Sequence, residues 1–197
     1  MAIPESPRRR SRDDVAEMAL HLLDEFGLPD LTMRRLATAL GVQPSALYWH
    51  FPNKQALLAA VSEQILAPMS DIHLDELPLP RAACALGARM RECLLEHRDA
   101  AELVSSSLAL GLVEPPVRPA LLDAARRHGV NDQLAEVAAE VVVHFVLGFV
   151  FHEQQRLTAD SLGLLERSPA ASTDEAGFTE AMTLIADGLE VSMGRRA

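Results

Sequence analysis

Apolar residues recur along most of the chain with the spacing of an α-helix. In the stretch that begins at Ser11, the residues Val15, Ala19, Leu22 and Phe26 repeat every three to four positions and share one helical face. Strict alternation of apolar and polar residues, which is typical of a half-buried strand, is almost absent. The pattern predicts an all-α fold with helices over about 11–26, 31–41, 42–51, 53–67, 81–97, 99–110, 116–128, 132–157 and 175–193, and a loop over 157–177.

Glycine, proline and capping residues mark the ends of the predicted helices. Gly41 can stop the second helix, Pro44 suits the first turn of the third, and Asn53 can cap the fourth directly after Pro52. The stretch after the fourth helix is rich in turn residues and holds three prolines before residue 81. It predicts a boundary between two domains, 1–66 and 67–197.

The second and third predicted helices are short and joined by a tight turn, which is the pattern of a helix-turn-helix. Ala37 is small enough for the next helix to cross close by, and Gly41 can adopt the left-handed turn conformation. Val42 would fill the gap between the helices, and Leu47 would anchor the third helix to the core. The pattern is only moderately specific, because many two-helix turns are purely structural.

A cluster of rings strengthens this interpretation. The chain has one Tyr and one Trp, and these stand side by side as Tyr48 and Trp49, followed by His50. Three successive residues of a helix point around most of its circumference, so these rings cannot all face the core. Some of them should face outward, toward a large partner.

Composition and charge narrow the class of protein. About half of the residues are apolar, which excludes a disordered chain. The most apolar stretch, "VVVHFVLGFVF", is too short to span a membrane and carries a His. No signal-like segment and no cysteine framework is present, so we expect a cytoplasmic protein with no membrane partner. The net charge of −10 lies entirely after residue 54, whereas 32–54 holds three bases and no acid. A locally basic patch can contact a polyanion, although an ordinary solvated face would have the same charge.

The segment "LTMRRLATALGVQPSALYWHFPNKQALL" resembles the DNA-binding domain of the tetracycline-repressor (TetR) family over about residues 11–66. The resemblance implies a three-helix helix-turn-helix domain, a C-terminal helical domain for ligand binding and dimerisation, and a homodimeric repressor that leaves a palindromic, double-stranded DNA operator when a small-molecule inducer binds. Carried over by position, the DNA-binding residues are Thr32, Met33, Arg34, Pro44, Ser45, Ala46, Tyr48, Trp49, His50 and Lys54. The family subgroup usually has a glutamine where Pro44 stands, so the base read there is lost or changed.

Two later segments, "LLEHRDAAELV" and "HFVLGFVFHEQQ", resemble the same subgroup, whose drug arrives as a magnesium chelate. Val104 stands where that subgroup has a metal-binding histidine, and His152 where it has a glutamate. Since valine cannot ligate magnesium and histidine suits that ion poorly, we expect a largely apolar ligand bound without metal or other cofactor. The predicted ligand-binding residues are Leu86, Met90, Val104, Ser107, His144, Phe145 and His152.

Several alternatives stay open at this point. His144 and His152 could instead be core or interface histidines. We expect dimerisation through about 131–156 and 174–193. The chain could be a regulator without a ligand, its C-terminal domain serving only for dimerisation. A metal-dependent hydrolase is the rival class, but His144 and His152 are eight positions apart rather than four, and no third ligand is evident, so we expect no enzyme.

Overall fold

The computed structural model describes residues 11–74, 76–164 and 173–195. Within these ranges there are helices and turns and no strand, so the predicted all-α fold is confirmed. The elements are α1 (Arg12–Phe26), α2 (Met33–Leu40), α3 (Pro44–Leu47), α4 (Lys54–Leu66), the short 3-10 helix η1 (Ala67–Asp71), α5 (Leu79–Leu95), α6 (Ala100–Ala109), α7 (Val117–Arg127), α8 (Asp132–Ser161) and α9 (Thr173–Gly194).

Local hydrogen bonds fix the start of the first two helices. The Ser11 side chain accepts from the backbone N–H of Asp14 at 3.0 Å, and the Asp14 carboxylate accepts from the N–H of Ser11 at 2.7 Å. This reciprocal pair satisfies two donors that a helix N-terminus otherwise leaves without a partner. Thr32 caps α2 by accepting from the N–H of Arg35 at 3.1 Å, and Gly41 ends it with φ 67°.

The third helix is shorter than predicted. It ends at Leu47, so Tyr48, Trp49 and His50 lie in a turn and not on a helix. The turn brings Phe51 into the core, where its side chain is fully buried, and Pro52 follows without an N–H to donate. Burial of Phe51 therefore ends the helix, since the chain must turn inward to reach the core.

The long loop predicted over 157–177 is wrong at both ends. Helix α8 continues to Ser161, and α9 already begins at Thr173, while 165–172 lie outside the described residues. The polar residues after 157 are compatible with helix because their hydroxyls bond to the helix backbone. The Thr158 hydroxyl donates to the carbonyl of Gln154 at 3.0 Å, and Gly163 then stops α8 with φ 67°.

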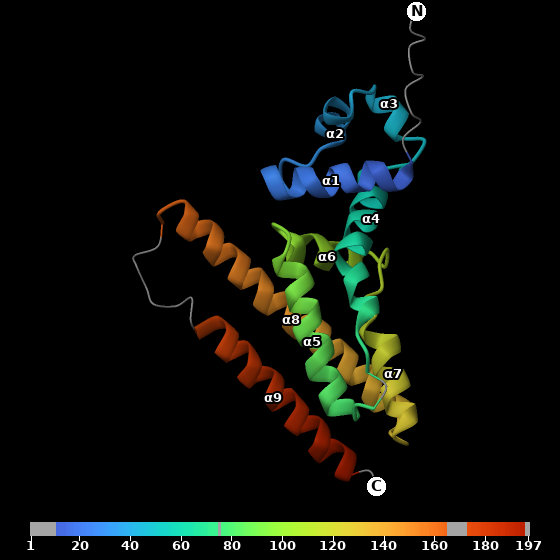
Figure 1. Cartoon of the computed structure of the whole chain (residues 1–197), viewed down its shortest axis with the longest axis vertical. Coiled ribbons are helices and arrows are strands. Elements are labelled where there is room, and N and C mark those ends of the chain that lie inside the picture. Colours follow the sequence, from blue (N-terminus) through green and yellow to red (C-terminus); the bar gives the residue numbers. More distant parts are fainter. Residues whose placement is uncertain (1–10, 75, 165–172, 196–197) are drawn as a thin grey trace, which may run out of the picture.

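Helix α4 connects the two parts of the molecule. Figure 1 shows α1, α2 and α3 gathered at one end, with α4 running from this end into the bundle formed by α5 to α9. Helix α4 packs against α1 on one side and against α5 and α6 on the other, and one continuous apolar core extends through both parts. A displacement of α4 therefore moves the end that carries the helix-turn-helix.

A second joint links α1 with the turn between α5 and α6. The Asp24 carboxylate lies 3.0 Å from Nδ1 of His97 and accepts from the N–H of Arg98 at 3.1 Å. The Asp99 carboxylate accepts from the N–H of Leu28 at 2.8 Å. Gly27 allows this close approach, because a Cβ added there would stand 2.8 Å from that carboxylate. The N-terminal helices are thus fastened to the bundle at two places.

Helices α8 and α9 lie side by side along one edge of the bundle (Figure 1). Large apolar side chains are exposed on both helices: Val137 and Val141 share one face of α8, and Leu184 and Val191 share one face of α9. By length and composition α8 could cross a membrane, which differs from the expectation based on uninterrupted apolar runs. Of its most apolar 18-residue window, 44% is buried within the chain, and α8 packs against α5, α6, α7 and α9. One face of α8 is therefore covered by the bundle.

Candidate nucleic-acid interface and ligand cavity

The turn after α3 presents its rings to solvent. Trp49 is 90% exposed and Tyr48 is 52% exposed, whereas Leu47 and Phe51 on either side are buried. A fold has no structural use for an indole ring in water, and exposed aromatic side chains are frequent at binding sites. Leu47 and Phe51 thus anchor the turn in the core at both ends, while the rings of Tyr48 and Trp49 face solvent.

The other predicted DNA-binding residues are exposed or half-buried. Thr32, Arg34, Pro44 and Ser45 are exposed, and Met33, Ala46, His50 and Lys54 are half-buried. Arg35 beside Arg34 has a structural role instead: its guanidinium lies 4.3 Å from the centroid of the Phe26 ring and 3.0 Å from Asp30. Arg34 is therefore the arginine of this pair that can reach a base or phosphate.

Lys54 occupies the N-terminus of α4. The Asn53 side chain caps this helix by accepting from the N–H of Ala56 at 2.8 Å. The positive end of a helix and the lysine ammonium both favour a phosphate at this position. The structure thus places a cation and a helix N-terminus beside the exposed turn.

Gln43 is a candidate that the sequence analysis omitted. It occupies the N-cap position of α3, where its exposed side chain makes no capping hydrogen bond. A glutamine amide can bond to the edge of adenine in the major groove. Its place next to Pro44 was the signal that could have identified it.

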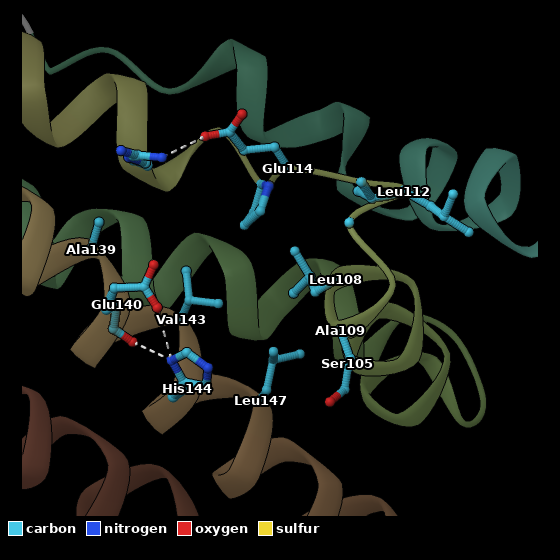
Figure 2. Close-up of a pocket in the computed structure, with 14 residues that line it drawn as sticks. Ser105, Leu108, Ala109, Leu112, Glu114, Ala139, Glu140, Val143, His144 and Leu147 are labelled. Carbon is cyan, nitrogen blue, oxygen red and sulfur yellow. Dashed lines mark hydrogen bonds and ion pairs between the residues drawn. The ribbon is translucent and has the colours of Figure 1, made fainter.

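A cavity of about 640 Å³ lies between α6, α8 and the segment that joins α6 to α7 (Figure 2). Apolar and polar groups share its walls. The larger apolar side chains are Leu108 from α6, Val143 and Leu147 from α8, and Leu112 and Val113 from the connecting segment. The volume lies within the range of drug-sized ligand sites. The remaining lining residues are Ser105, Ala109, Gly111, Glu114, Pro115, Arg118, Ala139, Glu140 and His144.

Polar and charged side chains also line this cavity, among them Glu114, Arg118, Glu140 and His144. The Arg118 guanidinium lies 3.7 Å from the Glu114 carboxylate and 3.1 Å from that of Glu136. The hydrogen bond from Arg118 to Glu136 raises the pKa of Arg118, so this group stays charged. Nδ1 of His144 lies 2.8 Å from the carbonyl oxygen and 3.4 Å from the carboxylate of Glu140 (Figure 2). The charges are largely paired with one another, which leaves the apolar side chains to contact a ligand.

The residues predicted to bind the ligand are not brought together around this cavity. Leu86, Met90 and Val104 are fully buried in the core, and Ser107 is buried against Ser62. Phe145 stacks on Phe178 with ring centroids 5.6 Å apart, and His152 is exposed. Only His144 of the predicted set lines the cavity.

Several lining residues were missed because they lie in the apolar stretch "LALGLVEPP" at 108–116. Its glycine and prolines indicate a loop, but they do not show which face of α6 the loop leaves uncovered. Among the described residues, no three His, Cys, Asp or Glu side chains are grouped so that they could hold a metal ion.

Comparison with known proteins identifies the protein family to which the chain belongs. Residues 16–61 match the family described as "Bacterial regulatory proteins, tetR family", and residues 81–178 match the "Tetracyclin repressor-like, C-terminal domain". The tetracycline repressor protein class A from transposon 1721 of Escherichia coli is 34% identical over 194 residues, covering 89% of this chain and 88% of the relative.

Solved structures agree with this match. The crystal structure of Mycobacterium smegmatis BioQ is 40% identical and superimposes with a TM-score of 0.81, covering 92% of this chain and 98% of BioQ. BioQ has also been solved with its double-stranded DNA operator, and that structure is 38% identical with a TM-score of 0.74 over the same shares of the two chains. The chain belongs to the TetR family of bacterial transcriptional regulators. It is a dimeric, ligand-responsive, DNA-binding repressor of this class.

Proposed function

We propose that this repressor is released from its operator by a drug-sized, largely apolar molecule that binds between α6 and α8 without a metal ion. The observation that carries the proposal is the cavity of about 640 Å³ with large apolar side chains from both helices. The protein would act in the cytoplasm, without catalysis, and with the division between its domains at residues 66 and 67.

The DNA-facing side of the proposal rests on the exposed turn and its surroundings. Arg34 and Lys54 would meet phosphates or a guanine edge, and Tyr48 and Trp49 would contact phosphates and thymine methyl groups. The proposal is supported by the exposure of Tyr48 and Trp49 between the buried anchors Leu47 and Phe51.

The dimer contact would use the exposed apolar face of α8 and α9. Val137 and Val141 stand on this face of α8, in the same part of the helix as the cavity residues Val143 and Leu147. A second copy packed there would cover apolar surface that is otherwise in water. Because the same helix borders the cavity, the dimer contact and the ligand site would adjoin.

The cavity can be tested with the uncharged fluorescent probe N-phenyl-1-naphthylamine. We expect its fluorescence to rise on binding to the protein, equally in magnesium and in EDTA. Ala109→Trp should abolish this rise, because Ala109 lines the cavity and is exposed enough to accept an indole without disturbing the core. Leu110→Trp is the matched control, since Leu110 is exposed and does not line the cavity.

If Ala109→Trp binds the probe as tightly as the wild type, the cavity is not the binding site. If the probe binds but the operator complex never responds to it or to other apolar aromatic molecules, the chain is a regulator that does not use this cavity as a switch.

A further inference from the structure

Two buried hydroxyl groups meet between α4 and α6. Ser62 is 0% exposed and Ser107 is 3% exposed, and their Oγ atoms lie 3.0 Å apart. The other buried polar side chains of the described residues are Glu153 and Gln154, both on α8. Ser62 and Ser107 are thus the buried polar contact between the helix that carries the helix-turn-helix and the helix that lines the cavity.

The two hydroxyls satisfy each other only in this arrangement. Ser62 Oγ lies 2.9 Å from the carbonyl oxygen of Leu58, one turn earlier on α4. A hydroxyl has one hydrogen, so when Ser62 donates to Leu58 it can still accept from Ser107. If α6 moved away from α4 by about 1 Å, the Oγ–Oγ distance would exceed hydrogen-bonding range and leave a buried hydroxyl without its partner.

Ser107 lies between residues that face the cavity. Ser105 and Leu108 line the cavity on one side of α6, while Ser107 points to the other side and contacts α4. A molecule that pushes on the cavity side of α6 therefore acts on the helix that holds Ser107.

The hydrogen bond adds a directional constraint to the apolar contacts around it. Dispersion contacts depend on distance but hardly on angle, whereas a hydrogen bond depends on both distance and angle. The buried hydroxyl pair therefore gives the α4–α6 contact a defined register. At its other end, α4 begins with Lys54 beside the exposed turn of the DNA-binding surface.

We infer that Ser62 and Ser107 are positioning residues that hold α4, and with it the helix-turn-helix, in the orientation that matches the operator. The inference rests on the proposed function in one respect, namely that α6 is the helix on which the ligand acts. The part that concerns positioning can be tested without any ligand.

The test uses the full-length dimer and an operator selected from a random duplex library. Operators with one base pair inserted or deleted between the half-sites report how firmly the distance between the two helix-turn-helix motifs of the dimer is fixed. The variants are Ser62→Ala, Ser107→Ala and the double variant, with Ser106→Ala as the control because Ser106 is exposed on the same helix. Affinities come from gel shifts and thermal stability from calorimetry.

We expect the wild type and Ser106→Ala to prefer the selected spacing, and each single variant to lose at least about fivefold of that preference, as one net hydrogen bond would give. The double variant is decisive. Removing both hydroxyls leaves no buried group without a partner, so its melting temperature should be close to that of the wild type. Its spacing preference should nevertheless fall as in the single variants.

A double variant that keeps the wild-type spacing preference would overturn the inference, and so would single variants that are less stable but equally selective. A wild-type protein that does not discriminate between spacings would also overturn it. Failure of N-phenyl-1-naphthylamine to bind would count against the proposed ligand site alone, because the spacing measurement contains no ligand.

Discussion

The carboxylate of Asp99 accepts a hydrogen bond from the backbone N–H of Leu28 at 2.8 Å, across 71 positions of the chain. Asp99 has φ 54° and is the non-glycine residue with positive φ in the part of the chain that the structure describes. A side chain in this conformation costs about 1 kcal/mol or more, so the bond to Leu28 offsets a local strain. The contact fastens the end of α1 to the turn before α6.

Two substitutions of Asp99 separate the strain from the hydrogen bond. Asp99→Gly removes both, whereas Asp99→Ala removes the bond and keeps the strain. We expect both variants to bind the operator more weakly, because the attachment of α1 to the bundle loses the hydrogen bond to Leu28 and keeps only the contacts of Asp24. Asp99→Gly should be the more stable of the two by about 1 kcal/mol in denaturant unfolding. Operator affinity unchanged in both variants would show that the joint does not position the DNA-binding surface.

Tyr48→Ala and Trp49→Ala should weaken operator binding without unfolding the protein. Both rings are exposed, and exposed substitutions usually change the free energy of unfolding by less than about 0.5 kcal/mol. Phe51→Ala is the structural contrast, since loss of this buried ring should cost about 3–5 kcal/mol. Trp49 is the single tryptophan, so its fluorescence should also change when operator is added. A Trp49→Ala protein that melts like Phe51→Ala would show that the indole is a core residue.

Lys54→Ala should weaken binding to all DNA sequences by a similar factor. A lysine that neutralises a phosphate contributes about one unit to the slope of log affinity against log salt, for each protomer. The slope should therefore become shallower by that amount, while discrimination between the operator and a mismatched duplex is kept. A change in sequence preference with an unchanged slope would place Lys54 against a base.

Val141→Glu should separate the two subunits. Val141 is 45% exposed on the exposed apolar face of α8, where a second copy would bury a charge without a partner. Sedimentation at micromolar concentration should give a dimer for the wild type and a monomer for this variant. Leu110→Glu, exposed at the end of α6, should stay dimeric. A wild-type monomer would contradict the expected use of this face.

The N-terminal helices could be predicted from local signals. Asn53 caps a helix in the structure as its position in the sequence indicated, and Gly41 adopts the left-handed conformation. These features depend on residues a few positions apart, which a sequence shows directly. The outward position of Tyr48 and Trp49 was also predictable, although the turn that carries them depends on burial of Phe51.

The ligand cavity could not be predicted in the same way. Leu86 and Val104 have the same apolar character whether they face a cavity or the core, and the structure places both in the core. Which side of α6 is left uncovered depends on how α8 and the segment after α6 pack, and this involves residues more than 25 positions apart, such as Leu108 and Val143. A resemblance transfers positions along the chain but not the shape of the space around them.

The most direct test of the central claim, that a largely apolar molecule releases this repressor without metal, is a titration of the operator complex. Labelled operator bound to the dimer is titrated with N-phenyl-1-naphthylamine and a panel of apolar aromatic molecules, in parallel with tetracycline plus magnesium, each with and without EDTA. We predict release by at least one apolar molecule with the same midpoint in EDTA, and no release by tetracycline. Release by tetracycline with magnesium that disappears in EDTA would contradict the account.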